Sequence, residues 1–147
     1  MFKHILVPTD GSGFSNKAVA TAARLAQSLR AKLLLLHVRS PLESPHHVEG
    51  GVLSSLGGEA VMQEIEDEER KLLDAALEIA AADGMKAETA FVAGYSTYDA
   101  IIRIAREQDC DLIVMASHGR RGISGFLPGS ETQKVLTHTT IPVLIVR

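Results

Sequence analysis

Glycines, two arginines and a serine are gathered in one segment near the end of the chain, residues 115–130. The segment follows an apolar run, residues 111–116, and leads into a short helical pattern that begins at Ser130. Its glycines let the backbone approach a ligand closely, and Arg120 and Arg121 add guanidinium groups. A strand, a glycine-rich loop and a helix N-terminus in succession can hold a phosphate through N–H groups and the helix dipole. The pattern therefore predicts a phosphate-binding loop.

The loop differs from two common nucleotide-binding motifs. A Walker A loop requires a lysine directly before its final Ser or Thr, but the residue directly before Ser130 is Gly129. The segment also lacks the Gly-x-Gly-x-x-Gly spacing of dinucleotide-binding proteins. The turn at residues 8–13 contains Gly11-x-Gly13, but Asn16 occupies the third glycine position.

A carboxylate stands in that turn, directly after the first predicted strand. Asp10 could accept hydrogen bonds from ribose hydroxyls, or help to hold a metal ion through water. The alternative is that Asp10 only closes a turn, because Asp-Gly is a common turn pair. Ligands of open α/β sheets bind at the carboxyl ends of strands, which favours the first interpretation.

Histidines offer little evidence for catalysis or metal binding. His118 lies in the loop and could exchange protons near neutral pH, but no carboxylate beside it in the sequence would orient it. His46 and His47 are adjacent and lack further ligands at metal-binding spacing. We therefore predict no catalytic residue and no structural metal site.

Composition limits the class of protein. The 147 residues suit a single domain, 1–147, and a formal net charge of -3 argues against nucleic-acid binding. No apolar run reaches the ~20 residues of a membrane span, and the first residues read as a strand rather than a signal peptide. We expect a cytoplasmic protein that binds neither nucleic acid nor membrane.

The single Cys110 is either a buried, inert thiol or a redox-sensitive one.

Predicted strands and helices alternate along the chain. Aliphatic runs predict strands at residues 4–9, 32–38, 87–92, 111–116 and 142–146. Helical periodicity predicts helices at residues 16–29, 59–82, 97–107 and 130–137. The irregular stretch at residues 39–58 is either a lid beside the site or a plain surface insertion. This alternation predicts an open, twisted α/β sheet with right-handed crossovers.

The loop resembles the nucleotide loop of the universal stress protein family, written Gly-x2-Gly-x9-Gly-Ser/Thr. Gly119 matches the second glycine, and Gly129 with Ser130 closes the motif, whereas Ala116 replaces the first glycine. A methyl group there either crowds a ligand or is tolerated at the strand end. The similarity extends to residues 1–12, 34–38 and 141–147. It implies an α/β fold with an open five-stranded parallel sheet in the order 3-2-1-4-5, helices on both faces, and a Rossmann-like, adenine nucleotide alpha hydrolase-like topology.

The resemblance implies an adenine-nucleotide site built from three segments. Pro8, Thr9 and Asp10 would lie by the nucleotide, and the main chain of Val38 would meet the adenine edge. The third segment would supply Met115, Ala116, Ser117, His118, Gly119, Arg120, Gly122, Gly129, Ser130, Glu131 and Thr132. Arg120 either reaches phosphate oxygens or belongs to a solvated face.

Glu131 complicates the choice of ligand. A carboxylate in the first turn stabilises an empty helix but opposes a terminal phosphate unless a cation intervenes. ATP, ADP and AMP therefore all remain candidate ligands, with Mg²⁺ possible for the triphosphate.

The resemblance implies a regulatory protein that senses ATP in a stress response and changes its association with an unidentified protein partner. The alternatives are a protein-interaction module without nucleotide binding and a slow ATP hydrolase. Against an enzyme, the sequence has no Walker lysine, no Ser-Gly-Gly pyrophosphatase loop and no His-x-Gly-His motif. The apolar last strand, Val143–Val146, predicts a homodimer, because an uncovered sheet edge invites pairing across a two-fold axis.

Overall fold

The computed structural model describes residues 1–40, 58–119 and 129–147. The strands are β1 (His4–Pro8), β2 (Lys32–Arg39), β3 (Glu88–Ala93), β4 (Leu112–Ala116) and β5 (Val143–Val146). The helices are α1 (Gly13–Leu29), α2 (Gly58–Ala82), α3 (Thr97–Glu107) and α4 (Ser130–His138). Strand and helix alternate as the sequence predicts.

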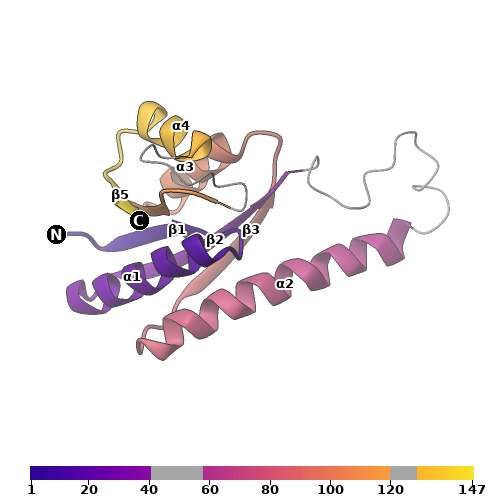
Figure 1. Ribbon diagram of the computed structural model, residues 1–147, viewed down its shortest axis with the longest axis horizontal. Helices are drawn as coiled ribbons and strands as arrows, with labels where there is room; N and C mark the ends of the chain where they lie inside the picture. Colours follow the sequence, from indigo (N-terminus) through magenta and orange to yellow (C-terminus); the bar gives the residue numbers. More distant parts are fainter. Residues whose placement is uncertain (41–57, 120–128) are drawn as a thin grey trace.

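The strands form one sheet in the order β3-β2-β1-β4-β5, and every neighbouring pair is parallel. This confirms the predicted order 3-2-1-4-5. Helices α1 and α2 cover one face of the sheet, and α3 and α4 cover the other (Figure 1). β1 and β4 lie side by side in the interior of the sheet, so the turns that follow them emerge at the same edge.

One apolar cluster fills the space on each side of the sheet. Leu33 and Leu35 of β2 belong to the cluster under α1 and α2, whereas Leu34 and Leu36 belong to the cluster under α3 and α4. Successive side chains of a strand point to opposite faces, so a strand covered on both sides reads as a continuous aliphatic run. Each of these buried leucines contributes about 2 kcal/mol relative to an exposed one.

Helix α1 begins at Gly13, three residues before the predicted start. Ser12 supplies the cap, because its side-chain oxygen accepts a hydrogen bond from Ser15 N at 3.2 Å. Ser15 is itself buried, and its hydroxyl donates to Ser12 O at 3.0 Å. The apolar periodicity used for prediction starts only after this turn, in which the buried residue is a serine, and this explains the difference.

Helix α2 buries one stripe of residues against the sheet, at Ile65, Leu73, Ala76 and Ala80. Leu72 and Leu77 are half-buried against the same cluster. Within the described residues, no helix combines the length and apolarity that a membrane crossing requires.

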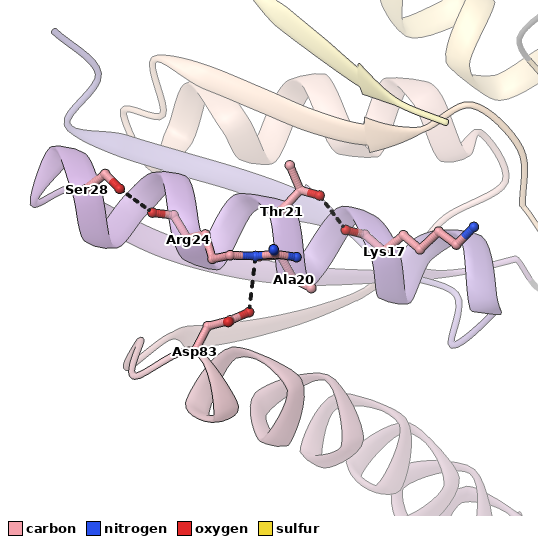
Figure 2. Close-up of polar contacts among 6 residues, drawn as sticks. All are labelled: Lys17, Ala20, Thr21, Arg24, Ser28 and Asp83. Carbon is pink, nitrogen blue, oxygen red and sulfur yellow. Dashed lines mark hydrogen bonds and ion pairs between the residues drawn. The ribbon is translucent and has the colours of Figure 1, made fainter.

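An ion pair joins the exposed side of α1 to the end of α2 (Figure 2). Arg24 Nε lies 3.6 Å from Asp83 Oδ2. On the same side of α1, Thr21 and Ser28 donate their hydroxyl hydrogens to backbone carbonyls one turn earlier, at 2.8 and 2.9 Å. The arginine side chain is 66% exposed, so the pair adds little stability and mainly fixes how the two helices meet.

Gly84 ends α2 in the left-handed conformation, with φ of 72°. A glycine in this conformation is a common helix terminator, because it has no Cβ to strain. We expect Gly84→Ala to lower the free energy of unfolding by about 1–2 kcal/mol, because alanine is strained at this φ. A Cβ would also lie 3.0 Å from Gln27 Nε2. Urea denaturation measures the change, with Gly13→Ala as the control, since a Cβ at Gly13 meets no atom within 4 Å. Equal stability of the two variants would contradict this account of the helix end.

Candidate functional site

The turns after β1 and β4 meet at the carboxyl ends of these two strands. A Cβ built on Gly119 would lie 2.8 Å from Asp10 Oδ2, closer than any real side chain allows. A Cβ at residue 119 would therefore force the Asp10 carboxylate to move, whereas glycine permits this approach of the two turns. The contact brings together two predicted site residues that are far apart in the sequence.

Asp10 closes its own turn and also faces the neighbouring one. Its Oδ1 accepts a hydrogen bond from Ser12 N at 2.9 Å, while Oδ2 is the oxygen nearest Gly119. Gly11 lies at the centre of the turn with φ of 77°, a conformation that favours glycine. Asp10 therefore closes its turn through Oδ1, and its other carboxylate oxygen, Oδ2, is directed toward the crevice.

Thr9 and Pro8 build the strand side of this turn. Pro8 is the last residue of β1 and pairs with Leu36 of β2. Thr9 is buried, and its hydroxyl oxygen lies 3.1 Å from Ser15 Oγ and accepts from Gly11 N at 3.3 Å. Both residues support the turn.

Val38 contributes its main chain rather than its side chain, which is buried among core residues. It lies one residue before the end of β2, because the strand continues to Arg39. Leu36 O accepts from Thr9 N at 2.8 Å, whereas Arg39 O accepts from Gly94 N at 2.9 Å on the opposite side of β2. Because alternate residues of an interior strand bond to opposite neighbours, Val38 directs its N–H and C=O toward the β1 side, as Leu36 does.

The β1–β2 ladder stops at this point. Continuing the register would pair Val38 N with Thr9 O and Gly11 N with Val38 O. Instead, Thr9 O is hydrogen-bonded to His37 Nδ1 at 2.7 Å, and Gly11 N donates to the threonine hydroxyl. Among the described residues, no hydrogen bond on this side engages the N–H or C=O of Val38. These groups form a donor–acceptor pair, which suits the edge of a planar base.

Hydrogen bonds join the end of β4 to the start of α4. Thr132 is buried and donates its hydroxyl to Ala116 O at 3.0 Å, while Gly129 N donates to Ser117 O. Ser117 N in turn donates to Val146 O at 2.8 Å. The N-terminus of α4 is thereby held at the carboxyl end of β4, where a phosphate loop needs it.

Space at this junction is tight. A Cβ on Gly129 would lie 3.3 Å from Ser117 O and 3.6 Å from His118 Cα. Gly129 is the N-cap of α4 and supplies no side chain to cap it, while Ser130, the first helical residue, is exposed. The first N–H groups of the helix therefore lack a side-chain cap from this position and suit an anion.

Ala116 departs from the family motif, yet its methyl group packs against the core cluster that α1 and α2 cover. Met115 before it is buried in the opposite cluster. This packing favours the interpretation that alanine is tolerated at the strand end. The methyl group has a place in the core rather than in open space.

His118 lies between the two turns. Its Nδ1 is 3.0 Å from Ser117 Oγ, and its ring lies 5.8 Å from the ring of Phe14 at the start of α1. These contacts orient the ring through a hydroxyl and an aromatic side chain.

Glu131 points toward α3. Its Oε2 accepts a hydrogen bond from Tyr98 N at 3.0 Å in the first turn of that helix, and its Oε1 lies 3.2 Å from Lys134 Nζ. Ser96, the N-cap of α3, makes no side-chain capping bond, so Glu131 takes over that role from another helix. The N-terminus of α3 and the lysine offset the negative charge, which weakens the objection to a triphosphate.

Several predicted positions lie outside the described residues. They are Arg120, Arg121, Gly122, Gly125, His46, His47 and most of the stretch at residues 39–58. Within residues 1–40, 58–119 and 129–147, no three His, Cys, Asp or Glu side chains are arranged to hold a metal ion.

Sequence reasoning missed two polar residues beside the site, His37 and Glu69. His37 Nε2 lies 2.8 Å from Glu69 Oε2, and both side chains are nearly buried. The available signal was a histidine within an otherwise aliphatic strand. Glu69 could not be singled out, because it belongs to an acidic run of the kind that usually forms a solvated helix face.

An open groove of about 360 Å³ lies elsewhere, between α2 and β3. Glu69, Arg70 and Phe91 are among its lining residues, and Glu69 and Phe91 also contact His37, but none of the site residues predicted from the sequence lines it. We therefore assign this groove no part in the candidate site.

Cys110 is buried just before β4, as the inert-thiol interpretation expects. Burial, and then the nearby charges of Asp111 and Asp109, raise the pKa of its thiol from 9.0 to about 11.

The raised pKa of Cys110 makes stability depend on pH. As the pH rises, the unfolded chain loses this proton before the folded chain does, so unfolding becomes easier. We expect stability to fall by about 2–3 kcal/mol through this group between pH 9 and pH 11. Urea denaturation across this range should show a flatter profile for Cys110→Ala; identical slopes would contradict the prediction.

A family model for the universal stress protein family matches residues 1–147, the whole chain. The chain belongs to the universal stress protein family. Among its relatives, the universal stress protein YxiE of Bacillus subtilis is 36% identical over 149 residues, and the match covers all of both chains.

Solved structures of universal stress proteins share the fold. The protein MJ0577 of Methanocaldococcus jannaschii has a TM-score of 0.78 at 27% identity, covering 99% of this chain and 96% of that one. A universal stress protein solved in complex with cAMP has a TM-score of 0.67 at 28% identity, covering 99% and 97%. That relative binds a ligand with an adenine base.

Proposed function

We propose that this chain binds an adenine nucleotide in the crevice between the turns after β1 and β4, and that its function is regulatory. The contact between Gly119 and Asp10 carries the proposal. It joins the carboxyl ends of two adjacent parallel strands, which is where open α/β sheets bind ligands. The relative solved with cAMP supports adenine as the base.

Each part of the nucleotide has a matching group in the crevice. The N–H and C=O of Val38 suit the adenine edge, and Oδ2 of Asp10, the oxygen nearest Gly119, suits the ribose hydroxyls. The backbone at Gly119 and the N-terminus of α4 at Ser130 suit the phosphates. The preferred ligand is ATP, with ADP and AMP as weaker ones and Mg²⁺ as a companion to the triphosphate.

The chemistry of the crevice favours binding and release over turnover. His118 contacts a hydroxyl and an aromatic ring, and the sequence lacks the known motifs for phosphoryl or nucleotidyl transfer. Nucleotide occupancy would instead alter the association of the protein with a protein partner in a stress response, in the cytoplasm.

Base specificity tests this proposal. A fluorescent ATP analogue bound to the nucleotide-free protein should be displaced by ATP, ADP and AMP, and by GTP only at concentrations at least about tenfold higher. A donor–acceptor pair on the main chain fits the edge of adenine and mismatches that of guanine, at a cost of one or two hydrogen bonds. Equal displacement by GTP would refute adenine recognition at Val38.

We further propose a homodimer formed through β5. This strand lies at the edge of the sheet, and Leu144 exposes 39% of its surface. Leu144→Lys is expected to convert the dimer into a monomer, because a lysine would be desolvated at the strand pairing. Light scattering after size exclusion measures the mass. Met62→Lys, at a more exposed position of α2, is the control, and a dimeric Leu144→Lys protein would rule out this interface.

A further inference from the structure

His37 is a buried histidine that is held at both ring nitrogens. Nδ1 lies 2.7 Å from Thr9 O, and Nε2 lies 2.8 Å from Glu69 Oε2 on α2. The ring also stacks on Phe91 of β3, with a centroid distance of 6.2 Å and an angle of 14° between the planes. Contacts from three elements therefore fix the orientation of this side chain.

The hydrogen-bond chemistry fixes the ring further. A carbonyl oxygen only accepts, so Nδ1 must carry the hydrogen that it shares with Thr9. Nε2 lies 2.8 Å from Glu69 Oε2, an ion-pair distance, although the two atoms do not meet hydrogen-bond geometry. Glu69 also approaches Arg39, with Oε1 4.0 Å from the guanidinium Nε. The carboxylate thus anchors the ring from the side opposite Thr9.

The bond to Thr9 has a consequence for Val38. The register of β1 and β2 would direct Val38 N toward Thr9 O, but His37 occupies that carbonyl at 2.7 Å. Among the described residues, the main chain of Val38 therefore makes no hydrogen bond of the β1–β2 ladder on the side that faces the crevice. The His37 side chain thereby competes with Val38 N for the Thr9 carbonyl, while the Thr9 hydroxyl takes Gly11 N, the donor that would otherwise pair with Val38 O.

We propose that His37 is a positioning residue of the nucleotide site. By holding the Thr9 carbonyl, it keeps the N–H of Val38 open to the edge of the base, beside the C=O that Gly11 N leaves unpaired, and Glu69 supports it from α2. The role in ligand binding rests on the proposed function. The effect on strand pairing does not rest on it, and can be measured without any ligand.

Two substitutions of the same residue test the proposal. His37→Phe keeps a planar ring but loses the donor, so Thr9 O becomes free to accept from Val38 N. We expect ATP affinity to fall at least about tenfold, the effect of one lost hydrogen bond to the ligand. His37→Asn places an amide N–H near the position of Nδ1 and is expected to retain most of the affinity. Calorimetric titration measures both variants.

Amide hydrogen exchange of Val38, followed by NMR without nucleotide, provides the second readout. In the wild-type protein and in His37→Asn, this amide should exchange faster than that of Leu36. In His37→Phe it should become protected, because the ladder extends by one bond. An unchanged exchange rate in a folded His37→Phe protein, together with unchanged ATP affinity, would overturn the proposal.

The two readouts separate this inference from the proposed function. If the wild-type protein binds no adenine nucleotide but Val38 gains protection in His37→Phe, the function fails and the control of strand pairing stands. If His37→Phe does not fold, Glu69→Ala serves instead, since it leaves the ring with one anchor. Glu69→Ala should slow the amide exchange of Val38 and weaken ATP binding, both by less than expected for His37→Phe. If neither quantity changes, the proposal is overturned.

Discussion

Replacing Gly129 by aspartate is expected to weaken ATP binding at least about 100-fold, equivalent to ~2.7 kcal/mol, without unfolding the protein. The new carboxylate would stand at the N-terminus of α4, where the proposed site holds phosphates, and would take the N–H groups that an anion needs. Its Cβ would also press on Ser117 O, 3.3 Å away. Calorimetric titration with ATP measures the loss, and urea denaturation checks the fold.

Gly129→Asn is the matched control. Asparagine has the same shape and caps a helix as well as aspartate does, but it carries no charge. The two variants share the steric effect, so the difference between their ATP affinities isolates repulsion of the phosphates. Indistinguishable affinities in the two variants would place the phosphates away from α4.

Asp10→Asn is expected to weaken ATP binding by about 10- to 100-fold, the effect of a lost hydrogen bond to a charged group. The amide oxygen of asparagine can still accept from Ser12 N, so the turn should persist. The oxygen that faces Gly119 is replaced by an NH₂ group, which cannot accept from a ribose hydroxyl.

The loss should depend on the sugar. With 2′,3′-dideoxy-ATP, which has no ribose hydroxyls to donate, the wild-type and Asp10→Asn proteins should bind almost equally. This comparison distinguishes contact with ribose from a general disturbance of the turn. A loss of the same size for both nucleotides would mean that Asp10 acts only as a turn residue.

Most of the fold follows from patterns that the sequence displays directly. The aliphatic run of β2 predicts a strand covered on both faces, and Leu33 to Leu36 occupy both clusters as expected. The order of the strands follows from the family resemblance, because alternation alone does not fix which strands are neighbours. The start of α1 was missed, because a buried serine hydrogen-bonded to the cap replaces an apolar residue in its first turn.

The site was predictable where backbone geometry determines the residue type. Gly119 and Gly129 both lie where a Cβ would crowd a neighbour, so the close packing at these positions is recognisable in the sequence as glycines. The contact of Glu131 with Tyr98 N could not be predicted, since Tyr98 belongs to another helix. The pairing of His37 with Glu69 also depends on tertiary contact, so neither residue type reveals it.

The measurement that tests the central claim most directly is calorimetric titration of the nucleotide-free wild-type protein with ATP, ADP and AMP, each with and without Mg²⁺. The account predicts saturable binding of ATP at one site per chain with micromolar affinity, about -8 kcal/mol. Weaker binding of AMP would follow from the lost phosphate contacts at α4. Folded protein that releases no heat with any of the three nucleotides, and gains no thermal stability from them, would contradict the account and point to a protein-interaction module instead.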